Sequence, residues 1–131
     1  MNTTGNNTDG LTLATAWTSL SKVNAQTFQA GDRVLFEGGK TFTGNIELDA
    51  LDGNIALQPL VLSTYGSGRA TISTTVTTKC GLKATNLQGV HIKNLIFLAI
   101  LKIGISLTSS VFESIAKGMY FFGKHQSDLI D

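Results

Sequence analysis

The run Gly38-Gly39-Lys40-Thr41, inside FEGGKTFTG at residues 36–44, has residue types that bind phosphate in nucleotide hydrolases. A phosphate loop also needs a glycine five residues before the second glycine of this run, and a helix directly after it. Position 34 is valine, which cannot adopt the open backbone angles of such a loop. The segment TFTGNIEL that follows is rich in β-branched and aromatic residues. The run therefore predicts a strand, a turn and a second strand.

Acidic residues are the next candidates, because grouped carboxylates bind calcium or act as catalytic acids and bases. The acids of this chain are scattered, and the nearest approach to a cluster is Glu47, Asp49 and Asp52 in ELDALD. In a strand Glu47 and Asp49 share one face, and Asp52 could join them at the following turn. This group is a candidate calcium site. A solvated strand end followed by a turn aspartate is the alternative, and we favour it.

Two histidines could serve as catalytic bases. His91 stands between the apolar residues Val90 and Ile92, so we expect it on an outer face, with no acid or second histidine near it in sequence. His125 stands in a polar tail. Neither has the partners that acid–base chemistry requires. We predict no catalytic, cofactor-binding or metal-binding residue in this chain, and no cofactor.

Other polar motifs also have simpler interpretations. YGSGRA at 65–70 is half of a dinucleotide-binding fingerprint, but the third glycine is missing and the next residues predict a strand. Asp32 is expected to cap a turn. We interpret Arg33, Arg69 and the lysines as outward residues that keep the protein in solution. Cys80 is the single cysteine, which excludes an internal disulfide and a cysteine metal cluster.

Length and composition exclude further classes of function. The 131 residues suit one domain, and charged residues make up only 15%, against about 25% in ordinary soluble domains. A net charge of +1 leaves no basic patch for nucleic acid. The most apolar run, LIFLAILKIGI at 95–105, is too short to span a bilayer and contains Lys102. We expect neither a nucleic-acid partner nor a membrane span.

One helix is predicted within residues 15–28, TAWTSLSKVNAQTF. Its apolar residues recur at intervals of three and four, which is typical of an amphipathic helix, and Gly31 is expected to end it. The members of that stripe are Trp17, Leu20, Val23 or Asn24, and Phe28. Residues 1–10, MNTTGNNTDG, predict a flexible polar lead and show no signal-peptide pattern.

After Gly31 the pattern changes to short strands in which apolar residues alternate with polar ones. The alternation breaks at Lys93–Asn94, where we expect a corner. The residues predicted to point inward are Val34, Phe36, Phe42, Ile46, Leu48, Leu60, Leu62, Ile72, Leu82, Ala84, Val90, Ile92, Leu95 and Phe97.

A weak internal repeat accompanies these strands. Residues 81–96 can be laid over residues 104–119, which places Gly81 on Gly104 and Leu82 on Ile105 at an offset of 23 residues. Repeats of this length are typical of solenoids, in which each coil buries its face by stacking on the next. A sandwich or meander of hairpins is the alternative, although LDGN at 51–54 holds the one Asn-Gly or Asp-Gly pair that lies between predicted strands of equal length. We predict an all-β solenoid.

The residues that carry a family resemblance lie at 16–48, AWTSLSKVNAQTFQAGDRVLFEGGKTFTGNIEL, and at 58–72, QPLVLSTYGSGRATI. Together they resemble the N-terminal entry of right-handed parallel β-helix proteins of the pectate-lyase-like superfamily. The resemblance covers residues 10–97 and concerns the fold more than the chemistry. It implies a right-handed parallel β-helix whose first coil is covered by an N-terminal capping helix. The matching residues are Trp17, Leu20, Gly31, Asp32, Gly38, Gly39, Phe42, Gly44, Pro59, Tyr65, Gly66, Gly68 and Ile72.

The proteins that this chain resembles most are extracellular carbohydrate-active proteins of bacteria. The resemblance implies an extracellular or cell-surface location, a polysaccharide partner of acidic character, and lyase or hydrolase activity in the intact protein, with calcium possible there. The alternative is a non-catalytic adhesin or carbohydrate-binding scaffold, because one fold serves both uses.

The C-terminal third departs from the family pattern. FLAILKIGISL at 97–107 is more apolar than the usual loop between coils, and the chain ends after few coils. We therefore expect residues 11–131 to be the cap and first coils of an incomplete β-helix that is inert alone. An open C-terminal coil would permit self-association.

Overall fold

The computed structural model describes residues 1–53, 55, 57–75, 80–86 and 89–99, together with the backbone of 105–108 and 120–122. This part of the chain contains one short helix, α1, and ten strands. The elements are α1 (Leu20–Asn24), β1 (Arg33–Glu37), β2 (Thr41–Thr43), β3 (Ile46–Leu48), β4 (Leu60–Tyr65), β5 (Ala70–Thr74), β6 (Leu82–Thr85), β7 (Val90–Ile92), β8 (Leu95–Ala99), β9 (Ile105–Thr108) and β10 (Tyr120–Phe122).

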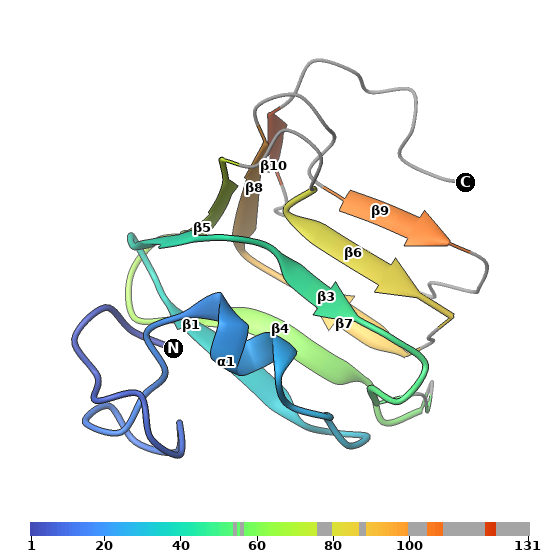
Figure 1. Ribbon diagram of the computed structural model, residues 1–131, viewed down its shortest axis with the longest axis horizontal. Coiled ribbons are helices and arrows are strands. Elements are labelled where there is room, and N and C mark those ends of the chain that lie inside the picture. The colour runs from blue at the N-terminus through green and yellow to red at the C-terminus, as the bar shows by residue number, and fades with distance from the viewer. Residues whose placement is uncertain are drawn as a thin grey trace.

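The strands form three sheets, and every strand pair in the described part of the chain is parallel. The sheet orders are β1-β4-β7, β2-β5-β8-β10 and β3-β6-β9. Each of the first three sets of three consecutive strands therefore adds one strand to each sheet, and Figure 1 shows β3, β6 and β9 lying one above another. Parallel pairing contradicts a meander of hairpins, which joins antiparallel neighbours. The arrangement is all-β and compatible with a parallel β-helix.

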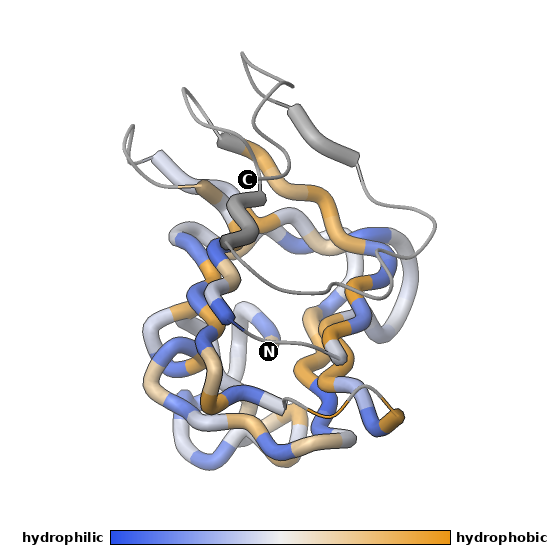
Figure 2. The backbone as a smooth tube through the Cα atoms, turned by 90° about the vertical axis from the view of Figure 1, so that its right-hand side faces the viewer, coloured by the Kyte–Doolittle hydropathy of each residue, from blue (hydrophilic) through white to orange (hydrophobic). Residues whose placement is uncertain are grey.

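The predicted inward residues are confirmed, because all fourteen are buried. The register stacks apolar residues on one another, as in the column of Phe42, Ile72 and Phe97. Phe36 and Phe42 also meet edge to face, with ring centroids 5.4 Å apart. Full burial of one large apolar side chain contributes about 1.5–3 kcal/mol, so these columns supply most of the cohesion between rungs. Figure 2 colours the backbone by hydropathy and shows hydrophobic segments recurring along the stacked strands.

Two local predictions are also confirmed. Leu82 of β6 is the register partner of Ile105 of β9, which is the pairing that the internal repeat predicts. Asn94 turns the corner between β7 and β8 with a φ of 55°. Asparagine tolerates this left-handed conformation better than most residues do.

The segment FEGGKTFTG forms a strand, a turn and a strand, as predicted. Gly39 has a φ of 75°, and a Cβ added at Gly38 would lie 2.4 Å from the carbonyl oxygen of Ser67. Both glycines are therefore needed to bring this turn close to the next one in the stack. No helix follows the turn, so the segment lacks the geometry of a phosphate loop.

The predicted helix exists, but its predicted extent is wrong. Only Leu20–Asn24 are helical, whereas Trp17 and Phe28 lie outside the helix, and it ends well before Gly31. Ser19 is extended, and the Asn24 side chain bonds to β3, so the segment is shaped by long-range contacts. Leu20 and Val23 are buried, and α1 packs against β3 at the first rung of the stack (Figure 1).

Gly31 instead belongs to a turn that Asp32 stabilises. The Gln29 N–H donates to the Asp32 carboxylate at 2.7 Å, which confirms the expected turn role of Asp32. Residues 1–10, expected to form a flexible lead, fold back along residues 14–17 through backbone hydrogen bonds. Met1 and Asn2 are buried.

The outer edge of β3 is covered by one side chain. Ile46 bonds to the β6 side of the sheet, so the Asn45 carbonyl and the Glu47 N–H face away from it. The Asn24 amide donates to the Asn45 carbonyl at 2.9 Å, and the Glu47 N–H donates to the Asn24 carbonyl oxygen at 3.0 Å. One carboxamide thus replaces a neighbouring strand, which protects an edge that would otherwise pair with another chain.

We predict that Asn24→Ala lowers the free energy of unfolding by about 1–2 kcal/mol, since two hydrogen bonds of ordinary strength are lost. Urea unfolding followed by circular dichroism measures the change. Asn45→Ala is the control, because the Asn45 side chain donates to the nearby Glu47 carboxylate and, among the described residues, is not bonded to the backbone at the edge of β3. Equal loss in both variants would contradict the edge role of Asn24.

Candidate functional site

A shallow hollow of about 580 Å³ lies on the outer surface, at the corner between the first and second sheets. Gly66 and Gly68 form it with φ values of 73° and 83°, and Asn94 occupies the equivalent corner one rung later. These small or turned residues leave the surface indented. The lining residues are Thr64, Gly66, Gly68, Arg69, Asn94 and Ile96.

Three exposed cations lie on successive rungs near this corner, and Arg69 lines the hollow itself. Thr41 pairs with Thr71, and Ala70 with Leu95, so Arg69 stands opposite Gly39 and Asn94, while Lys40 and Lys93 are each offset from it by one residue, in opposite directions. Adjacent strands are about 4.8 Å apart, which sets the rise from one rung to the next. We call Lys40, Arg69 and Lys93 the basic corner.

From the sequence these cations are predicted only as outward residues that keep the protein in solution, and not as neighbours at one corner. The signal that could have found them is the distance of each cation from the strand that follows it. Lys40 directly precedes β2, Arg69 directly precedes β5, and Lys93 stands two residues before β8. Parallel stacking of those strands places the three cations on successive rungs.

Tyr65 lies at the end of β4, opposite Glu37 in the register. Partial burial and the negative charge of Glu37 raise the pKa of Tyr65 above its ordinary value. The phenol therefore stays protonated at neutral pH, and its hydroxyl lies beside the Asn2 side chain.

The candidate calcium group does not form a cluster. Asp52 is buried, and its two carboxylate oxygens accept the N–H groups of Phe28 at 3.0 Å and of Asp49 at 2.9 Å. Asp49 accepts the Leu51 N–H at 2.8 Å. No three His, Cys, Asp or Glu side chains in the described ranges are placed to hold a metal ion. Asp52 is therefore a turn aspartate, as we expected in place of a calcium ligand. Its side chain is buried, however, and not exposed to solvent.

We predict that Asp52→Ala destabilises the fold by about 3 kcal/mol, because two buried N–H groups lose a charged acceptor. Asp49→Ala, at an exposed position, should cost much less. Thermal unfolding with added calcium chloride gives the second measurement: the melting temperature should not rise. A calcium-dependent rise that Asp52→Ala abolishes would contradict this structural role.

The remaining candidates are separate from one another. His91 lies on the outer face of β7 opposite Val61, as predicted. His125 lies outside the described residues. YGSGRA forms the end of β4, a turn and the start of β5, which is not the strand–helix context of a dinucleotide site. Cys80 is half-buried and forms no disulfide with another described residue.

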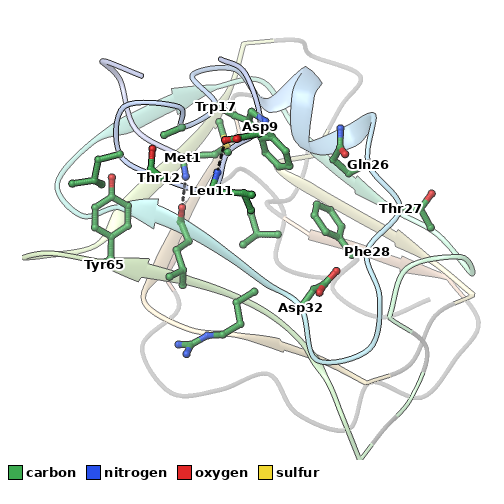
Figure 3. A pocket seen from close by; sticks show the side chains of 16 residues that line it. Met1, Asp9, Leu11, Thr12, Trp17, Gln26, Thr27, Phe28, Asp32 and Tyr65 are labelled. Atoms are coloured by element: carbon green, nitrogen blue, oxygen red, sulfur yellow. Dashed lines mark hydrogen bonds between the residues drawn. The ribbon is translucent and has the colours of Figure 1, made fainter. Parts of the chain in front are cut away.

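A second hollow, also about 580 Å³, lies at the N-terminal end of the stack, and we call it the end pocket. Residues 9–17 form one wall, residues 26–28 another, and β1 the floor (Figure 3). Figure 3 places Trp17 and Asp9 together on one side, with Phe28 and Asp32 away from Tyr65.

Two polar side chains of the end pocket, those of Trp17 and Asp9, are bonded to the N-terminal loop that forms one of its walls. The Trp17 indole donates to the Thr8 carbonyl at 3.0 Å, and Gly10 lies so close to the ring that an added Cβ would clash with it. Hydrogen bonds from the Thr15 side chain and the Leu11 N–H lower the pKa of Asp9, so its carboxylate is ionised at neutral pH. The pocket has the shape of a binding site without a nucleophile–base pair.

Comparisons of the chain with protein-family models, curated proteins and solved structures found no match. The strand pairing alone defines the class, which is an all-β protein built from sheets of parallel strands. Among the described residues, no helix has the length and apolar character needed to cross a bilayer.

Proposed function

We propose that this chain is the N-terminal part of an extracellular right-handed parallel β-helix protein that acts on an acidic polysaccharide. In this proposal the three sheets are the three faces of one β-helix, and α1 with the N-terminal loop covers its first rung. The observation that carries the proposal is the basic corner, because it places Lys40, Arg69 and Lys93 on successive rungs.

Acidic polysaccharides carry carboxylates at regular intervals, and a column of cations can meet several of them together. Arginine forms two parallel hydrogen bonds with one carboxylate, whereas lysine acts as a compact point charge. Exposed pairs are weak individually, so affinity would come from repetition along the polymer. The backbone of the corner glycines supplies neutral contacts beside Arg69.

We propose that catalysis belongs to coils beyond residue 131, with calcium binding there as well. Glycosidases need two carboxyl groups about 5–9.5 Å apart, and lyases need a positioned base, commonly with calcium ligands. In the described ranges Asp52 is committed to backbone N–H groups, and the register neighbour of His91 is Val61.

A non-catalytic adhesin or carbohydrate-binding scaffold is the second candidate function. It is favoured by the same observation, since the basic corner is arranged for binding and not for bond cleavage. Acidic groups stacked on successive downstream coils would indicate an enzyme, and their absence would indicate an adhesin. Self-association through a C-terminal coil also stays a proposal, because that coil lies largely outside the described residues.

We predict that polygalacturonate retards the protein in affinity electrophoresis and that neutral dextran does not. Arg69→Gln and Lys93→Gln should each weaken the retardation about 3–10-fold, since each removes one contact with a carboxylate, and added salt should weaken it in the parent protein. Lys83→Gln is the control, because Lys83 is exposed on the third sheet. Equal retardation of all three variants would contradict a role for the basic corner.

We also predict that this chain alone does not cleave pectate, alginate or chondroitin, with or without calcium. Absorbance of unsaturated products detects lyase activity, and reducing-end release detects hydrolysis. Product formation above that of a heat-denatured sample would show that the catalytic groups lie within these 131 residues.

A further inference from the structure

The turn between β4 and β5 is longer than the turn that follows it in the stack. Residues 66–69 join β4 to β5, whereas residues 93–94 alone join β7 to β8. Because β4 pairs with β7 and β5 pairs with β8, these two turns lie on successive rungs. The shorter turn cuts across the corner, and among the described residues it leaves one side of the longer turn open. The hollow at this corner lies between the two turns and is lined by residues of both.

The carbonyl groups of the longer turn face the first rung. The Gly38 N–H donates to the Tyr65 carbonyl at 2.8 Å. The carbonyl oxygens of Ser67 and Gly68 lie on the same side, because both would meet a Cβ added at Gly38. In a trans peptide unit the C=O and N–H bonds point in opposite directions. The N–H groups of Gly66 and Gly68 therefore face the third rung, where the hollow lies.

These two N–H groups are open to a ligand. Neither has an acceptor within the ranges that the structure describes, and both residues line the hollow. Gly66 and Gly68 have φ values of 73° and 83°, whereas Ser67 between them does not have a positive φ. A turn in which the handedness alternates gathers N–H groups on one side, and such a concavity binds anions.

The side chains around the hollow add to this preference for an anion. Arg69 is the one charged residue among the described lining residues, and Thr64 and Asn94 contribute neutral side chains that can donate hydrogen bonds. A guanidinium group has five N–H donors, so Arg69 can hold a carboxylate beside its other contacts. The hollow thus offers backbone donors and one positive charge to the same small group.

We propose that this hollow seats one ionised carboxylate, and that the protein therefore recognises the free-acid form of its polysaccharide and not the methyl ester. One carboxylate oxygen accepts from the N–H groups of Gly66 and Gly68, and the other accepts from the Arg69 guanidinium. Methyl esterification removes the charge that strengthens all of these hydrogen bonds. The inference rests on the proposed function, and it assigns to one turn the group by which the polymer is selected.

The test is a titration of the ¹⁵N-labelled protein with trigalacturonate, followed through the assigned amide signals of Gly66 and Gly68. We expect saturable shifts of both signals, with a Kd below about 10 mM. The methyl ester of the same trisaccharide should bind at least about fivefold more weakly. Inorganic phosphate, in a third titration, distinguishes a free anion from the sugar acid. Unshifted glycine signals, equal binding of the ester, or a response to phosphate without one to trigalacturonate overturns the proposal.

A pair of matched variants locates the seat. Ile96→Glu brings a competing carboxylate to the hollow, because Ile96 lines it from the outer face of β8, and should weaken trigalacturonate binding about tenfold. Leu98→Glu is the control, since it adds the same charge to the same face of β8 at a residue that is 42% exposed and outside the described lining of the hollow. Equal weakening by the two variants would indicate general repulsion and would overturn the seat.

The carboxylate seat and the polysaccharide proposal can fail separately. Retardation by polygalacturonate with unchanged signals of Gly66 and Gly68 would overturn the seat and leave the polysaccharide proposal intact. A response of both glycine signals to trigalacturonate, without retardation by the polymer, would support the seat and contradict the polysaccharide proposal.

Discussion

Parallel stacking of short strands is the constraint on which the rest of this structure depends. Each rung is too short to be stable alone, and its inward residues become buried only when the next rung covers them in register. The columns of Phe42, Ile72 and Phe97, and of Val34, Leu62 and Ile92, provide that contact. The same register that fills the core also decides which outward side chains share a corner, so the basic corner is a consequence of core packing.

Stacking leaves an unpaired edge at each end of the column, and the N-terminal end shows how such edges are covered. Met1 bonds to the edge of β1, and the Asn24 carboxamide bonds to the edge of β3, so one backbone residue and one side chain perform the same task. β2 is only three residues long, which limits what could pair with it. The cap thus acts through hydrogen bonds as well as through the apolar cover that Leu20 and Val23 provide.

The sequence predicts the inward residues well because alternation within a strand is a local property. Val34 and Phe36, or Val90 and Ile92, can be assigned without knowing any partner strand, and Asn94 marks a corner through its own conformational preference. The helix bounds could not be predicted in this way, since Asn24 is fixed by bonds to residues 45 and 47. The roles of Asp52 and of the basic corner depend on contacts between distant segments. Stacked partners are separated by unequal lengths of chain, 23 residues for Leu82 and Ile105 but 36 for Ile46 and Leu82, so no fixed period reveals them.

The two hollows differ in what they can recognise, and the difference follows from where their unmet interactions lie. At the corner, turned backbone and small residues leave an indentation that Arg69 lines, so the charge available there is positive. In the end pocket the Trp17 indole and the Asp9 carboxylate are bonded within the N-terminal loop that forms one wall, so these two side chains hold the wall in place.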